Sequence, residues 1–163
     1  MRRHVLVLDG LHLLARAVPG ALLLWAGIGK VFDRQGSVLA VSGYDVVPGS
    51  LVEPVAIILP WLEILLGVLL VLGLFTRIAG IATAVLMGAF IAGMLQAKAR
   101  GLQIDCGCFG SGGPGDGVSW LEVLRDVPLV AAGLFLAIRP EGPWQLDAYF
   151  RTEENDDGEP VQA

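Results

Sequence analysis

The sequence predicts an all-α integral membrane protein, a four-helix bundle with short loops. The first observation behind this fold class is composition, since 55% of the 163 residues are hydrophobic and only 17% are charged. The second is that the apolar residues gather in four stretches separated by polar turns. A soluble core of this length cannot bury so much apolar surface, whereas a bilayer accepts spans of about 20 apolar residues. We therefore expect one membrane domain over residues 1–150.

The net charge of −5 belongs to the C-terminal end. Five acidic residues and no Lys or Arg follow Arg151, and the remaining acidic and basic residues balance. A short polar, acidic segment of this kind does not form a core, so residues 151–163 are predicted to be a disordered tail. No basic patch with interleaved aromatic residues occurs, which argues against nucleic-acid binding.

The first two spans are predicted at Leu11–Phe32 and Pro54–Leu74. Arginines precede the first, as in a signal peptide, but its apolar run is long and no small-x-small cleavage site follows before Lys30. We interpret it as a retained span rather than a removed signal. The residues between the two spans, which include several Gly and Pro, are predicted to form a loop.

The third span is predicted at Ile78–Gln96, where it forms a hairpin with the second after a very short turn. Small residues recur every four positions along it, at Gly80, Ala84, Gly88 and Ala92. This spacing lets a neighbouring membrane helix approach closely. The fourth span is predicted at Trp120–Ile138 and is the least apolar of the four.

Orientation follows from the positions of Lys and Arg, which favour the cytoplasmic side. With both termini inside, the inner segments hold Arg2, Arg3, Arg16, Arg77, Arg139 and Arg151, and the outer ones hold Lys30, Arg34, Lys98 and Arg100. We therefore expect cytoplasmic termini in a bacterial plasma membrane. The glycine-rich loop over residues 101–119 then faces the extracytoplasmic side.

This loop carries the only cysteines, Cys106 and Cys108, in the string Asp-Cys-Gly-Cys-Phe-Gly over residues 105–110. Two thiols one residue apart form a disulfide only in a tight turn, and Gly107 removes the Cβ that would obstruct it. Strained, exposed disulfides are readily reduced, so we interpret the pair as redox-active. A metal site, which needs three or four ligands, and a purely structural pair are the alternatives.

Four charged residues fall within the predicted spans, namely Lys30, Glu63, Arg125 and Asp126. A charge at a helix centre costs about 2.5–3.5 kcal/mol on insertion scales, so these groups are expected to face one another. Under the proposed orientation, all four lie in the outer half of the bilayer beneath the cysteine loop. They predict either a polar pocket for a quinone or for proton transfer, or an internal ion-pair network. A further alternative for Arg125 is that its side chain extends to the membrane interface.

These residues carry a resemblance to a known family. The chain resembles the methylamine-utilisation MauE group within the wider DoxX-like membrane proteins over residues 11–138. The resemblance is carried by Gly-Ile-Gly-Lys ending at Lys30, Pro-Trp-Leu-Glu ending at Glu63, the Cys-Gly-Cys-Phe-Gly string, and Trp120 followed by Arg125 and Asp126. It implies a four-helix membrane protein that acts in disulfide formation on exported proteins beside a thioredoxin-like partner. Cys106 and Cys108 would be its exchanging pair.

The sequence therefore predicts a membrane component of thiol–disulfide exchange, with Cys106 and Cys108 as the reacting residues. Membrane thiol oxidases of the DsbB and VKOR type use two cysteine pairs, whereas this chain has one. A partner would then supply a second pair, or electrons would pass directly to an acceptor such as a quinone. The alternative from another class is a non-catalytic membrane subunit or assembly factor, with or without quinone binding, of a respiratory or oxidoreductase complex.

Overall fold

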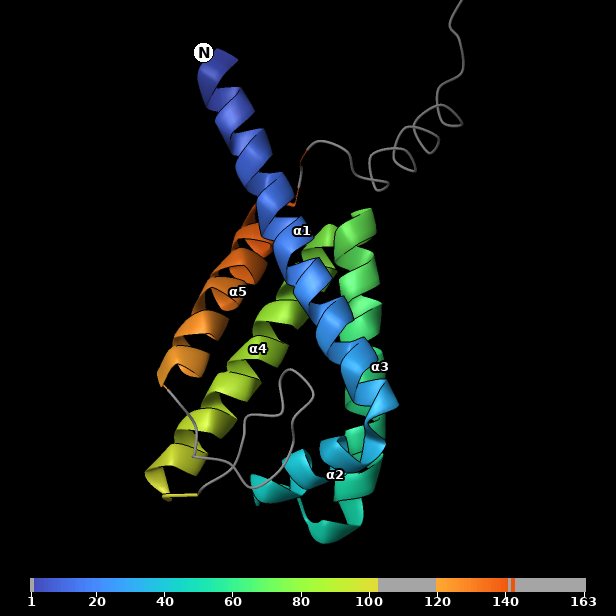
Figure 1. The fold of residues 1–163 in the computed structure, drawn as a ribbon. Helices are drawn as coiled ribbons and strands as arrows, with labels where there is room; N and C mark the ends of the chain where they lie inside the picture. The colour runs from blue at the N-terminus through green and yellow to red at the C-terminus, as the bar shows by residue number, and fades with distance from the viewer. Residues whose placement is uncertain (1, 103–119, 141, 143–163) are drawn as a thin grey trace, which may run out of the picture.

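The computed structural model describes residues 2–102, 120–140 and 142, and its regular elements there are all helices. In chain order they are α1 (Arg2–Phe32), α2 (Arg34–Gly43), α3 (Gly49–Leu72), α4 (Thr76–Ala99) and α5 (Trp120–Ile138) (Figure 1). The predicted all-α class is confirmed. Cys106, Cys108 and the acidic tail lie outside the described residues.

Three of the described helices are long and apolar enough to cross a membrane: Leu8–Phe32 of α1, and the whole of α3 and α4. Their 25, 24 and 24 residues exceed the length that a bilayer requires. Large apolar side chains cover their outer surfaces, and Trp25, Ile78 and Val85 are 69%, 65% and 67% exposed. The chain is thus a membrane protein. The helix α5 has the bounds predicted for a fourth span. Its three charged residues keep it outside the group of helices that are apolar enough to cross a membrane. The fourth membrane span therefore stays a prediction.

Glycines allow the second half of α1 to pack side by side with α3 (Figure 1). A Cβ added at Gly67 would lie 2.8 Å from the carbonyl oxygen of Gly20, and one added at Gly27 would lie 2.8 Å from that of Pro60. Larger residues at these positions would force the two backbones apart. Small residues at helix contacts in membranes permit this close van der Waals packing.

A second close pair is formed by α4 and α5, and it uses part of the predicted small-residue stripe. A Cβ at Gly80 would lie 2.8 Å from the carbonyl oxygen of Gly133, and a Cβ at Gly133 would lie 2.9 Å from the backbone nitrogen of Ala84. A Cβ at Gly88 would meet nothing within 4 Å. The first half of the stripe is therefore a helix contact, and Gly88 is not part of it.

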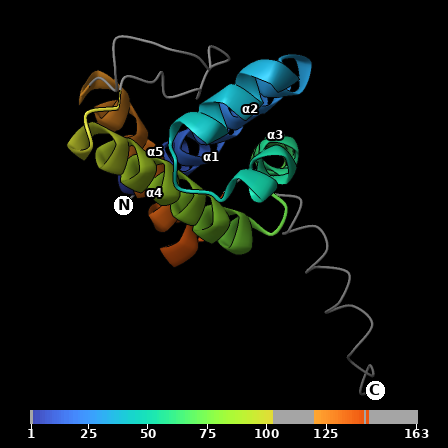
Figure 2. The same cartoon turned by 90° about the horizontal axis from the view of Figure 1, so that it is seen from below.

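The segment expected to be a loop between the first two spans contains the helix α2, so that expectation was wrong. Asp33 caps the helix, because its carboxylate accepts a 2.9 Å hydrogen bond from the backbone N–H of Gly36. Such a cap satisfies a donor that the first helical turn leaves without a partner. Gly36 and Ser37 are buried, and α2 packs against α3. Figure 2 shows α2 from below, beside the ends of α1 and α3.

The remaining differences concern helix ends. The first helix begins at Arg2 instead of Leu11, and the next long one begins at Gly49 instead of Pro54. The predicted short turn between the second and third spans is confirmed, since α3 ends at Leu72 and α4 begins at Thr76. Gly73 adopts a left-handed backbone with φ of 68°, the usual way for a glycine to end a helix.

Candidate functional site

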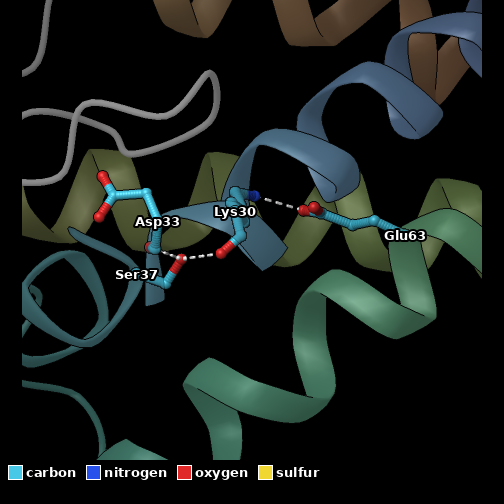
Figure 3. A network of polar contacts seen from close by, with 4 residues as sticks. All are labelled: Lys30, Asp33, Ser37 and Glu63. Carbon is cyan, nitrogen blue, oxygen red and sulfur yellow. Dashed lines mark hydrogen bonds and ion pairs between the residues drawn. The ribbon is translucent and has the colours of Figure 1, made fainter. Parts of the chain in front are cut away.

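A buried ion pair joins α1 to α3 inside the membrane-spanning part of the protein. The Nζ atom of Lys30 lies 2.5 Å from Oε1 of Glu63, and both side chains are buried (Figure 3). The Lys30 ammonium also lies 5.1 Å from the ring centroid of Phe90 on α4. Removing two charges from water is costly, and close pairing within hydrogen-bond distance offsets much of this cost.

The sequence around each partner explains their approach. Gly27 lies one helical turn before Lys30, and Pro60 lies one turn before Glu63, and these two residues are in backbone contact. The long lysine side chain therefore crosses a narrow gap between two closely packed helices. Ser37 of α2 adds a further contact, because its hydroxyl donates to the backbone carbonyl of Lys30 at 3.2 Å and to that of Asp33 at 2.9 Å (Figure 3).

Asp126 of α5 completes a three-residue cluster with Lys30 and Glu63. All three line one small cavity of about 20 Å³, whose other lining side chains are apolar. Oε2 of Glu63 and Oδ2 of Asp126 are buried and accept no hydrogen bond from the described residues. A cavity of this size holds one water molecule. The cluster thus places one ammonium and two carboxyl groups from three helices around a water-sized space.

Arg125 takes a different position from the other three charged residues that the sequence singled out. Its Nε lies 3.5 Å from Oδ1 of the neighbouring Asp126, but its side chain is 39% exposed and does not line the small cavity. The structure therefore brings Lys30, Glu63 and Asp126 together and leaves Arg125 at the edge of the cluster.

A larger cavity of about 240 Å³ adjoins the cluster and shares Lys30 with it. It lies between α2, α3 and α4, and its walls are apolar except for Lys30, Ser37 and Tyr44. Phe90 contributes an aromatic wall, and Ala89 at the rim is exposed. The sequence analysis missed this cavity because it treated the segment that forms α2 as a loop. An aspartate at position 33, three residues before Gly36, is a residue type that often caps the start of a helix, and it was the available signal for α2.

A second polar group, which the sequence analysis also missed, lies toward the other end of α1. His12 is buried, and its Nε2 lies 3.0 Å from the backbone carbonyl oxygen of Arg139, just after α5. Its ring is 6.1 Å from that of Phe135. Arg16, one turn further along α1, is buried as well. These contacts connect the first half of α1 to the end of α5.

The two ends of the cysteine-bearing segment lie close together at the end of the molecule that contains α2 (Figure 1). Lys98, in the last turn of α4, lies 5.0 Å from the ring centroid of Trp120, where α5 begins. Arg100 forms an exposed ion pair with Asp45 at 2.5 Å. Among the described residues, no group of three or more His, Cys, Asp or Glu side chains could hold a metal ion.

Comparisons with known proteins place the chain in a family. A family model described as methylamine utilisation protein MauE matches residues 8–139. The chain is 39% identical over 117 residues to the methylamine utilization protein MauE of Paracoccus denitrificans. This alignment covers 71% of this chain and 62% of that protein. The chain is 36% identical over 123 residues to the protein of the same name in Methylorubrum extorquens, covering 75% and 66% of the two chains.

A third relative, the methylamine utilization protein MauE of Methylophilus methylotrophus, is 30% identical over 120 residues, or 73% of this chain and 63% of that protein. Each of these alignments spans slightly less than two thirds of the relative's length. No solved structure matches the chain. Because the family model covers most of the chain and three relatives align with over two thirds of it, the chain belongs to the MauE family.

Proposed function

We propose that this protein is a membrane accessory protein of methylamine utilisation that exchanges disulfides through Cys106 and Cys108. Its partner would be a thioredoxin-like protein or an exported thiol substrate at the extracytoplasmic face of a bacterial plasma membrane. The observation that carries the proposal is the Cys-Gly-Cys sequence in a glycine-rich segment within the region that the MauE family model matches. The assignment to methylamine utilisation rests on the names of the three relatives.

The described residues support a protein–protein reaction at one end of the molecule. The segment that carries the cysteines leaves α4 and enters α5 where Lys98 and Trp120 are in contact. Beside this point, Met94, Ala97 and Val123 form a small buried core that joins the two helices. Both ends of the reactive segment are thus fixed to packed helices, which limits the region that its two thiols can reach.

The exchange itself conserves atoms and electrons. The thiolate of one cysteine attacks a disulfide sulfur of the partner, which forms a mixed disulfide and releases the other partner sulfur as a thiolate. The second cysteine then attacks the mixed disulfide, so the pair becomes a disulfide and the partner becomes a dithiol. The reverse sequence oxidises the partner by the same steps. Two electrons and two protons pass between the two pairs in either direction.

Trapping of the mixed disulfide tests this proposal. Cys106→Ser and Cys108→Ser variants would be produced in cells growing on methylamine, quenched with acid, alkylated and analysed on non-reducing gels with mass spectrometry. We expect one variant, the one that lacks the resolving thiol, to accumulate a covalent adduct with a single partner. A control variant would keep both serines and add Ser119→Cys, which leaves one thiol in the same segment but outside the motif.

Two results would overturn the exchange function. One is an equal yield of adducts from the control variant, because any thiol in the segment would then be captured. The other is the absence of adducts from both single variants together with normal growth on methylamine of the double serine variant. That second result would favour the non-catalytic alternative, in which the helices hold a partner during assembly of another complex.

A further inference from the structure

We propose that the 240 Å³ cavity between α2, α3 and α4 binds the ring of a membrane-soluble quinone, with the Lys30 ammonium donating a hydrogen bond to a ring carbonyl. The site consists of described residues only and does not depend on the thiol chemistry. The polar cluster of Lys30, Glu63 and Asp126 is not itself the binding chamber, because its own cavity of about 20 Å³ is too small for a ring. The cluster is instead the polar wall behind the chamber.

Size and shape favour a single substituted ring. An engineered apolar cavity of about 150 Å³ binds benzene, so a 240 Å³ cavity has room for a six-membered ring with its carbonyl oxygens and small substituents. Phe90 and Tyr44 contribute aromatic rings to the walls, and planar ligands pack well against such faces. Gly93 lines the chamber beside Tyr44, and a Cβ there would lie at an ordinary contact distance of 3.6 Å from that ring.

The chamber is also accessible from the apolar part of the membrane. Ala89 of α4 and Val46 before α3 both line it and are both exposed. α4 is one of the helices that are long and apolar enough to cross a membrane, and Ala89 is an exposed residue near its middle, where a crossing helix meets the lipid chains. A ligand that dissolves in lipid therefore has a route to the chamber past Ala89.

The polar wall favours a ligand with a neutral carbonyl over one with an anionic phosphate. An ammonium has three N–H donors, and among the described residues Lys30 uses one of them on Glu63 and directs its charge at the ring of Phe90. A donor remains for a ligand oxygen. Two carboxyl groups, on Glu63 and Asp126, face this one cation, so an anionic phosphate at the same place would be repelled. A neutral carbonyl, as in a quinone, accepts the hydrogen bond without adding charge.

The test uses the full-length protein in lipid nanodiscs with a short-chain azidoquinone as photolabel, and the labelled peptides are mapped by mass spectrometry. We expect labelling in α2, α3 and α4 at the chamber, and displacement by excess decylubiquinone. Decylbenzene, which has the ring and chain but no carbonyl, should displace the label about tenfold less well. Displacement by added phospholipid as effective as that by decylubiquinone would identify a lipid site and overturn the proposal.

Two matched variants locate the site. Gly93→Leu places a side chain in the chamber, and its Cβ makes only an ordinary contact with Tyr44, so folding is expected to be retained. Gly88→Leu makes the same change on the same helix where no atom lies within 4 Å of the added Cβ. We expect a loss of labelling of about tenfold or more for the first and none for the second. Equal labelling of both variants would show that the quinone lies elsewhere.

The double variant Lys30→Met/Glu63→Leu tests the hydrogen bond without leaving a buried charge alone. It should fold, keep the chamber, and bind decylubiquinone no better than decylbenzene. Retention of the preference for the carbonyl compound would overturn the role of Lys30. Loss of labelling here with normal mixed-disulfide trapping at Cys106 or Cys108 would separate quinone binding from thiol exchange.

Discussion

Lys30 of α1 and Glu63 of α3 form a buried ion pair across a helix contact that is made close by glycine. Their charged atoms are 2.5 Å apart, and the second oxygen of Glu63 accepts no hydrogen bond from the described residues. The single hydrogen bond between them therefore leaves hydrogen-bonding capacity on both partners. Pairing offsets much of the cost of burying these two charges, whereas removal of one partner leaves the other charge buried without compensation.

Replacement of one member of the pair should therefore destabilise the protein strongly. Lys30→Met leaves Glu63 as a buried carboxyl group without its cation, and we expect a loss of about 3–5 kcal/mol of unfolding free energy. The double variant Lys30→Met/Glu63→Leu should recover most of that loss, because it removes the second charge as well. Unfolding of the purified protein in detergent, followed by circular dichroism, measures both values.

The exposed pair of Arg34 and Glu53 is a matched control for this prediction. It has the same 2.5 Å separation, but its side chains are 63% and 65% exposed. Arg34→Met should change stability by no more than about 1 kcal/mol, as is usual for surface pairs. Equal losses from Lys30→Met and Arg34→Met would show that burial of the α1–α3 pair has no energetic consequence.

A methyl group added at the contact between Gly80 and Gly133 should lower the stability of the protein. A Cβ at Gly80 would lie 2.8 Å from a backbone oxygen of α5, so α4 and α5 must separate to admit it. We expect Gly80→Ala to cost about 1–3 kcal/mol, the usual range for overpacking. Gly88→Ala, where the methyl group meets nothing, is the control and should change stability little. A thermal unfolding series in one detergent compares the two.

His12 should contribute to stability through its contact with the end of α5. His12→Leu removes the ring nitrogen that lies 3.0 Å from the Arg139 carbonyl oxygen, and we expect a loss of about 1 kcal/mol. His12→Gln retains a donor and should lose less. Hydrogen exchange at the last turn of α5 checks the location of the effect, and unchanged exchange in His12→Leu would contradict it.

The proposed orientation can be measured with thiol labelling in intact cells. A membrane-impermeant maleimide should modify Cys106 and Cys108 after reduction, because their segment is predicted to face outward. In a variant with both residues replaced by serine, Leu74→Cys places a single thiol in the turn between α3 and α4, at the other end of α4. This thiol should react only after the membrane is permeabilised. Reversed labelling of the two sites would invert the topology.

The sequence by itself predicted the helical class, three of the helices that are long and apolar enough to cross a membrane, and the bounds of α5, because these depend on local composition and on the length that a bilayer requires. It also predicted that Lys30, Glu63, Arg125 and Asp126 would face one another, since a charge inside a membrane needs a partner, and the structure brings the first, second and fourth of these together. It did not predict α2, for which the Asp33 cap was the one local signal. The residues of that segment favour a loop locally, and its helix depends on the Asp33 cap and on packing against α3.

The larger cavity and the position of Arg125 were decided only by the tertiary structure. A cavity is the space left when helices distant in the sequence pack together, and no single segment of this chain specifies the space between α2, α3 and α4. Arg125 and Asp126 are neighbours, yet one is partly exposed and the other buried, because successive residues on a helix point about 100° apart. Sequence thus determined that charged groups within the spans need partners, and packing determined which of them are buried and share a site.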